Sequence, residues 1–160
     1  MPDRSAAERA TIEVIRSPQQ MQEALGIRFS VFVEEQQVPI EEEVDAFDDR
    51  PGERHDVVQV LVRLDGSPAA TARLLLAHEG DGYPHIGRVA VLAAHRGTGL
   101  GRVVMEALHA EARRRGERGI TLSAQLHALP FYERLGYVAH GPVYLDAGIE
   151  HREMDLVFDD

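Results

Sequence analysis

Three glycines in five positions, Gly97-Thr98-Gly99-Leu100-Gly101, form the segment with the clearest chemical meaning. Glycine has no side chain and tolerates positive φ, so such a loop brings several backbone N–H groups against one anion. An amphipathic helix is predicted to begin in the same place, and the positive end of its dipole would face that anion. The spacing predicts a loop that binds a phosphorylated cofactor. A purely structural glycine turn is the alternative.

Two common nucleotide-binding loops fit this segment poorly. A Walker loop ends in Gly-Lys-Ser/Thr, a string that the chain lacks. A dinucleotide fingerprint requires a further glycine where this chain has Arg102, and it belongs to a first β-α-β unit. Here the loop follows several predicted strands instead. A different phosphate ligand is therefore expected.

The elements that would position this loop can be read from periodicity and capping. A capping box, Ser17 with Gln20, begins a helix that should stop before Pro39, and a second helix carries apolar residues at helical spacing over residues 100–115. Strands are expected at residues 11–16, 57–64, 69–76, 83–92, 120–124, 137–145 and 149–158, with a short helix at 130–135. The order β-α-β-β-β-α-β-α-β-β predicts one mostly antiparallel sheet flanked by helices.

Composition sets the broad class. The 160 residues suit one domain at 11–160 after a loose arm at 1–10, and that arm lacks the apolar centre of a signal peptide. No apolar run is long enough to span a membrane, so a cytoplasmic protein without a membrane partner is expected. The absence of cysteine excludes disulfides, thiolate metal sites and a cysteine nucleophile, and no metal site is predicted. The net charge of −10 argues against a nucleic-acid partner.

The negative charge is concentrated in residues 34–49, which hold eight acidic side chains and no basic one. A charge run of this kind is often a solvated loop. It is alternatively a rim that attracts a cationic substrate. The sequence leaves both interpretations open.

Two strings around the glycine loop resemble the GCN5-related N-acetyltransferases. The loop matches R-x-x-G-x-G/A over residues 96–101, and the apolar run at 86–91 resembles the strand that precedes it in that family. The string Q-L-H-A-L-P-F-Y-E-R-L-G at 125–136, followed by Tyr137, resembles the second cofactor motif. Ser123 departs from the asparagine of many relatives, which puts one polar contact near the cofactor in doubt. The resemblance covers about residues 11–157.

A narrower resemblance is to the ElaA-like branch. Residues 28–36 read R-F-S-V-F-V-E-E-Q, an acidic connection leads from Asp45 to His55, and residues 148–154 read G-I-E-H-R-E-M. The family resemblance implies an α/β (α+β) fold with a mixed, mostly antiparallel sheet of six to seven strands and about four helices. It also implies acetyl-CoA as co-substrate.

The resemblance assigns the cofactor contacts residue by residue. The backbone of residues 89–91 would pair with the pantetheine arm, and N–H groups of residues 96–101 would hold the pyrophosphate. The expected cofactor-binding residues are Val89, Ala90, Val91, Arg96, Gly97, Thr98, Gly99, Leu100, Gly101, Arg102, Gln125 and Phe131.

The resemblance also implies a mechanism. Tyr132 would donate a proton to the departing thiolate, with a structural core tyrosine as the alternative. Glu34 is the first candidate for the general base, while Glu35 and His151 are expected at the substrate. Because the chain lacks cysteine, an amine of a small molecule or protein would attack acetyl-CoA directly in a ternary complex. A non-catalytic acyl-CoA-binding sensor is the competing function, and the last hairpin offers an edge for pairing with a second copy.

Overall fold

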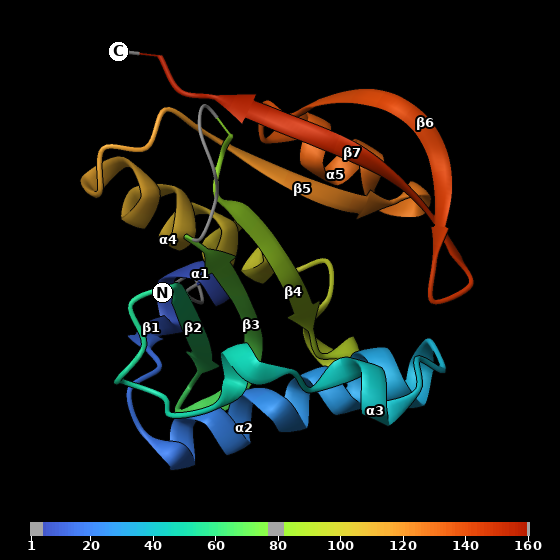
Figure 1. Cartoon of the computed structure of the whole chain (residues 1–160). Helices are drawn as coiled ribbons and strands as arrows, with labels where there is room; N and C mark the ends of the chain where they lie inside the picture. The colour runs from blue at the N-terminus through green and yellow to red at the C-terminus, as the bar shows by residue number, and fades with distance from the viewer. Residues whose placement is uncertain (1–4, 77–81, 160) are drawn as a thin grey trace.

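A computed structural model of the protein describes residues 5–76 and 82–159. They form one seven-stranded sheet in the order β1-β2-β3-β4-β5-β7-β6 (Figure 1). The strands are β1 (Ala10–Val14), β2 (Val57–Leu64), β3 (Ser67–Leu75), β4 (His85–Val91), β5 (Gly119–Gln125), β6 (Val138–Asp146) and β7 (Ile149–Val157). All neighbouring strands run antiparallel except β4 and β5, which are parallel. The mixed, mostly antiparallel sheet expected from the sequence is confirmed.

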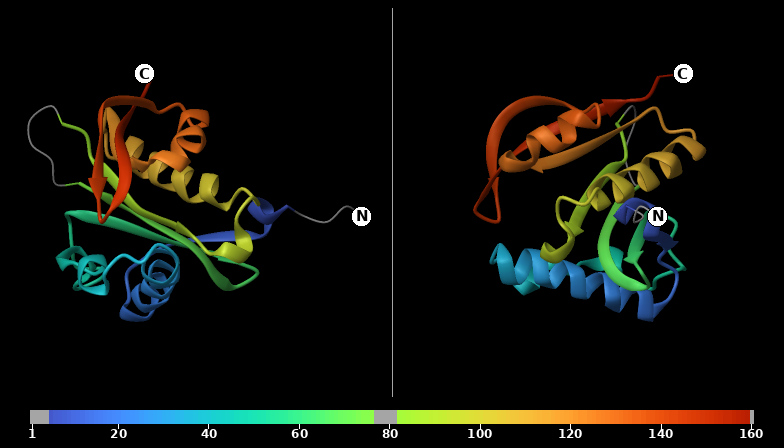
Figure 2. Two further views of the ribbon diagram at one scale, coloured as in Figure 1. Left: turned by 90° about the vertical axis from the view of Figure 1, so that its right-hand side faces the viewer. Right: turned by 180° about the vertical axis from the view of Figure 1, so that it is seen from behind.

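Helices cover the two faces of this sheet (Figure 2). Alternating side chains of β2 explain the arrangement: Val60 and Val62 pack in the core with α4, and Leu61 packs in a second core with α2. The α-helices are α1 (Ala6–Arg9), α2 (Pro18–Arg28), α3 (Ile40–Glu43), α4 (Leu100–Arg114) and α5 (Leu129–Arg134). The other helical segments are the π-helix η1 (Phe29–Glu35) and the 3₁₀ turns η2 (Ala46–Asp48), η3 (Ala93–His95) and η4 (Leu126–Ala128). Within the described ranges, no helix is long and apolar enough to cross a membrane.

The two main helices begin as their sequences predict. Ser17 and Gln20 form the expected capping box, and α2 continues into η1, which ends before Pro39. Gly99 adopts a φ of 92° at the N-terminus of α4 and caps it without a side chain. The backbone N–H groups of the first turn of α4 therefore have no side-chain cap.

The N-terminal segment differs from the expected loose arm over its described part. Ser5 caps α1 by accepting a hydrogen bond from the Glu8 backbone N–H. Ala6 is buried in the main core, and Ala10 already pairs with Leu64 in the sheet. The polar composition of residues 1–10 did not indicate this helix, because only one of its residues, Ala6, is buried in the core.

The acidic segment 34–49 folds back onto buried arginines rather than forming only a solvated loop. The Arg28 guanidinium is fully buried and contacts Glu43 and Asp48, with N···O distances of 2.7 Å to each carboxylate. Arg73 holds Asp45 in the same way through two hydrogen bonds of 2.8 and 2.6 Å. These ion pairs fix α3 and η2 beside the sheet, and they account for three of the segment's carboxylates.

The centre of the sheet is split between β4 and β5. These strands pair only at His85 with Thr121 and at Ile86 with Leu122, and then they diverge. The β3–β4 register shifts nearby, where Arg88 adopts a φ of 53°. Beyond Ile86, one edge of β4 has no strand partner, which opens the sheet next to the start of α4.

Candidate active site

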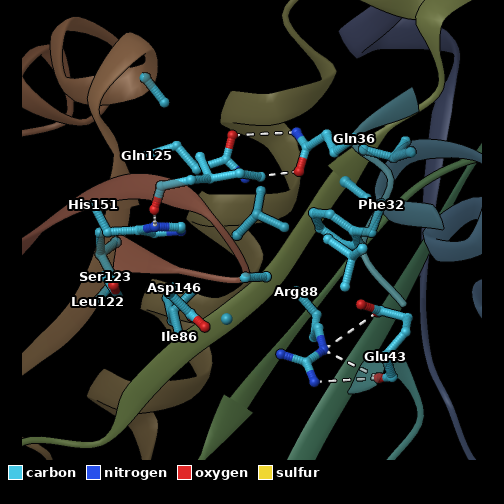
Figure 3. Close-up of a pocket in the computed structure, with 18 of the residues that line it drawn as sticks. Phe32, Gln36, Glu43, Ile86, Arg88, Leu122, Ser123, Gln125, Asp146 and His151 are labelled. Carbon is cyan, nitrogen blue, oxygen red and sulfur yellow. Dashed lines mark hydrogen bonds and ion pairs between the residues drawn. The ribbon is translucent and has the colours of Figure 1, made fainter. Parts of the chain in front are cut away.

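The gap between β4 and β5 leads into a cavity of about 590 Å³ (Figure 3). Its walls come from η1 and α3 on one side and from β5 and the β6–β7 hairpin on the other. In Figure 3, Ser123, Gln125 and His151 lie across the cavity from Phe32 and Gln36. The cavity therefore lies between the two halves of the split sheet.

The free edge of β4 forms one wall. Val89, Ala90 and Val91 all line the cavity, as the resemblance implies. A strand without a neighbour presents unpaired N–H and C=O groups, which an extended ligand can bond as a further strand would. This edge leads from the middle of the cavity toward the glycine loop.

The glycine loop lies where β4 reaches α4. Gly97 and Gly99 have positive φ values of 77° and 92°, so both need a residue without Cβ. Gly101 needs space instead: a Cβ there would lie 3.1 Å from Cζ of Phe131 and 3.9 Å from Cγ2 of Val91. The predicted contact Phe131 thus packs against the back of α4 and does not line the cavity. The loop leaves the first turn of α4 open toward solvent beside Val91.

Polar residues of the loop are held by local contacts. The Thr98 hydroxyl donates to the His95 carbonyl, and Arg102 is exposed and pairs with Glu106 at 2.7 Å. Arg96 lines the cavity, donates from Nε to the Val91 carbonyl at 3.1 Å, and is the only one of these residues with a partner in η1.

That partner is Glu35, and it corrects one expectation. An oxygen of Glu35 lies 2.7 Å from Arg96, so this carboxylate faces the cofactor loop rather than an acceptor. Glu34, expected as the general base, is exposed and lies outside the residues that line the cavity. The π-helical turn explains both positions, because its wider repeat rotates side chains away from the α-helical directions.

Tyr132 lies in the cavity wall, on α5 and within the second cofactor motif. It is 9% exposed and packs edge-on against Phe131 and Tyr137, with ring centroids 5.0 and 5.9 Å away. Burial raises the pKa of its phenol to about 12. Within the described ranges no side chain hydrogen bonds its hydroxyl, so the O–H is available to a group in the cavity.

His151 presents one defined nitrogen to the cavity. Its Nδ1 lies 2.7 Å from the Ile149 carbonyl, and a carbonyl only accepts, so Nδ1 carries the proton. In the neutral ring Nε2 is then an acceptor. The ring is buried and stacks on Tyr144 with centroids 6.0 Å apart. His127 also lines the cavity, but it is exposed.

Two glutamines join the walls across the cavity, as Figure 3 shows. Gln36 Nε2 donates to Gln125 Oε1 at 3.2 Å, and Gln125 Nε2 donates to Gln36 Oε1 at 2.8 Å. Gln125, expected at the cofactor, is thus engaged with η1. Sequence reasoning missed Gln36 as a site residue, although it ends the ElaA-like string at 28–36.

Some charged side chains around the cavity form an ion pair, and others are exposed at its rim. Arg88 faces Glu43, with Nε 3.3 Å from Oε1, and burial lowers the pKa of the Arg88 guanidinium. Glu42 and Asp146 line the cavity from opposite walls and are exposed. Arg88 was not among the expected site residues, because neither its φ of 53° nor its contact with Glu43 can be read from residue type.

Comparison with known proteins agrees with this architecture. Residues 55–158 match the acetyltransferase (GNAT) domain. The uncharacterized N-acetyltransferase YjcF of Bacillus subtilis is 38% identical over 143 residues, covering 88% of this chain and 95% of its own. An acyl-CoA N-acyltransferase from Pseudomonas aeruginosa superposes with a TM-score of 0.78 at 34% identity, covering 92% of this chain and 98% of its own.

The expected ElaA-like likeness is also found. The crystal structure of Escherichia coli ElaA matches with a TM-score of 0.79 and 27% identity, covering 92% of this chain and 99% of that protein. With a family match over more than half of the chain and a relative above 30% identity along most of both proteins, the conclusion is direct. The chain belongs to the GNAT family of acyl-CoA-dependent N-acetyltransferases.

Proposed function

We propose that this protein transfers an acetyl group from acetyl-CoA directly to a primary amine of a small molecule or a protein. One observation carries the proposal: the free edge of β4 lines the cavity as far as Arg96, and the chain then continues directly into the N-terminus of α4, which has no side-chain cap. An extended arm ending in a pyrophosphate fits that combination of groups.

The cofactor would use each part of this wall differently. The pantetheine arm would pair with the backbone of residues 89–91, and the N–H groups of residues 97–101 would bind the pyrophosphate. A backbone N–H of β4 near Val91 would polarise the thioester carbonyl, as oxyanion donors do. Arg96 is held by Glu35, so it contributes less charge to the phosphates than a free arginine would.

Tyr132 would assist the departure of the thiolate. Full proton transfer from a phenol with a pKa of about 12 to a thiolate whose acid has a pKa near 8.5 is uphill by roughly 5 kcal/mol. A hydrogen bond from the Tyr132 hydroxyl to the developing thiolate is therefore the dominant contribution. The proton that the product thiol finally keeps can come from solvent.

The acceptor would be a cationic amine, held by Glu42 of the acidic segment 34–49 and by Asp146, in place of Glu35. Glu42 and Asp146 stand on opposite walls of the cavity, and each is exposed at its rim. A second positive charge on the acceptor would be attracted by both, while His151 Nε2 would accept a hydrogen bond from the reacting amine. We expect dicationic amines to show a lower KM than neutral ones, and the difference to shrink at high salt.

The experiment is a panel of amines incubated with the purified protein and acetyl-CoA, with release of free CoA thiol as the readout. Polyamines, amino sugars and peptide N-termini cover the main classes, and mass spectrometry identifies the amide product. Binding of acetyl-CoA without turnover across the panel would instead support an acyl-CoA-binding sensor. Failure to bind acetyl-CoA in calorimetry would refute both functions.

A further inference from the structure

A series of hydrogen-bonded side chains begins at the cavity wall and is not used by the proposed function. Ser123 on β5 stands directly opposite Glu153 on β7, and Tyr144 reaches across from β6. The Tyr144 hydroxyl bonds the Ser123 hydroxyl and also lies 2.5 Å from Glu153 Oε1. Three strands thus place three protic groups in series, and Ser123 is the member that lines the cavity.

The count of protons fixes the direction of these bonds. An ionised carboxylate only accepts, so the single proton of the Tyr144 hydroxyl is donated to Glu153. The contact between the two hydroxyls must then be made by the Ser123 proton, with the Tyr144 oxygen as acceptor. The Ser123 oxygen consequently keeps its lone pairs for a donor in the cavity. Figure 3 shows Ser123 next to His151, where the acceptor amine is expected.

We infer that Ser123, Tyr144 and Glu153 form a relay that removes the proton of the acceptor amine. The inference rests on the proposed function. In one concerted step the ammonium N–H bond breaks and the proton joins the Ser123 oxygen. The Ser123 proton moves to the Tyr144 oxygen, and the Tyr144 proton moves to Glu153. The free amine attacks the thioester carbonyl and the C–S bond breaks. The nitrogen loses its second proton to solvent as the amide forms, and the released thiolate takes one proton from solvent. Glu153 then returns its proton to water.

The groups around the Ser123–Tyr144–Glu153 relay are compatible with proton transfer toward Glu153. Burial and the bond to Glu153 both raise the pKa of Tyr144, so its hydroxyl stays protonated at neutral pH. Burial lowers the pKa of His85, which faces Glu153 from β4, so that imidazole is neutral and does not compete as a cation. His140 stands opposite Glu153 on β6, and Asp146 adds negative charge near Tyr144.

The relay is tested by the pH dependence of kcat with the best amine of the panel. Tyr144→Phe keeps the ring that stacks on His151 but cannot pass a proton. We expect it to lower kcat about 100-fold near neutral pH, the lower end of what general base catalysis contributes. Its kcat should then rise about tenfold per pH unit toward the pKa of the amine, because bulk solvent must supply the free base. The affinity for acetyl-CoA should not change.

Two further substitutions separate a relay from a structural role. Ser123→Ala should show the same pH-dependent loss, and Ser123→Thr should restore kcat because it restores the hydroxyl. Glu153→Gln still accepts the Tyr144 bond but cannot take up a proton, so it should match Tyr144→Phe in profile.

Matched controls remove comparable groups elsewhere. Tyr137→Phe loses a buried hydroxyl that contacts His109 Nε2 at 2.7 Å and does not line the cavity. Glu150→Gln removes an exposed carboxylate from the same strand as Glu153. Both should keep the wild-type pH profile.

The outcomes are distinct. A Tyr144→Phe variant with wild-type kcat, or with the same fractional loss at every pH, overturns the relay while leaving the proposed function intact. A wild-type protein that acetylates no amine of the panel refutes the proposed function itself, before any variant is made.

Discussion

Replacement of Tyr132 by phenylalanine tests the central chemical step of the proposed function. The ring packs against Phe131 and Tyr137, and the variant keeps those contacts while it removes only the hydroxyl. Because no side chain in the described ranges bonds that hydroxyl, the change leaves no partner unsatisfied in the protein itself. The expected loss is therefore confined to turnover.

The expected loss in kcat is that of a hydrogen bond, because the high pKa of the Tyr132 phenol opposes full proton transfer. A hydrogen bond to a charged group contributes about 1.5–3 kcal/mol, which corresponds to roughly a 10- to 150-fold lower kcat. A loss of roughly 10,000-fold or more would instead require obligatory proton transfer from the phenol, which its pKa of about 12 opposes. The structure thus predicts a moderate effect on kcat.

The assay is kcat from thiol release, together with the dissociation constant of acetyl-CoA from calorimetry. The dissociation constant should stay within about twofold of the wild-type value, since the ground-state thioester gains little from the hydroxyl. A folded Tyr132→Phe variant with unchanged kcat would refute the assignment and favour a structural core tyrosine. Equal losses in kcat and in acetyl-CoA affinity would show that the hydroxyl binds the cofactor instead.

Three other predictions concern the frame of the site. Gly101→Ala should weaken acetyl-CoA binding measured by calorimetry and lower stability by about 1–3 kcal/mol, because its Cβ would lie 3.1 Å from the ring behind it; unchanged affinity would contradict the tight packing. Arg28→Met should lower the free energy of unfolding in urea by about 3–5 kcal/mol, since the buried Glu43 and Asp48 would lose their 2.7 Å ion pairs and keep only longer contacts to other arginines; a loss below about 1 kcal/mol would count against it. The contribution of Tyr132 to stability should be constant below about pH 10 and fall by about 3 kcal/mol as pH rises toward 12, because burial raises the pKa of its phenol in the folded state only. Chemical unfolding of the Tyr132→Phe variant should lack that contribution.

Much of the fold could be predicted from residue patterns. The strand at 57–64 is found with the expected bounds, and α2 and α4 begin where capping and periodicity place them. These signals are local, since each depends on residues within about one helical turn or on alternation along one strand. By contrast, α3 and η2 are short and depend on ion pairs with Arg28, which lies 15 and 20 positions away from its partners.

The site was predictable to a smaller extent, for the same reason. The glycine loop and Tyr132 belong to contiguous strings, so the resemblance located them. Glu34 lies outside the cavity lining on a π-helical turn, and nothing in its residue types indicates that repeat. Glu35 pairs with Arg96 across 61 positions, a contact that only the closed sheet brings together.

The amide pair between Gln36 and Gln125 has a consequence for how kinetic data on this protein are read. The two walls of the cavity are joined there by groups that carry no charge and do not titrate in water. Neither acidity nor ionic strength changes that contact directly. A pH or salt dependence of turnover therefore does not arise from this amide contact, and it reports on ionisable groups elsewhere in the site.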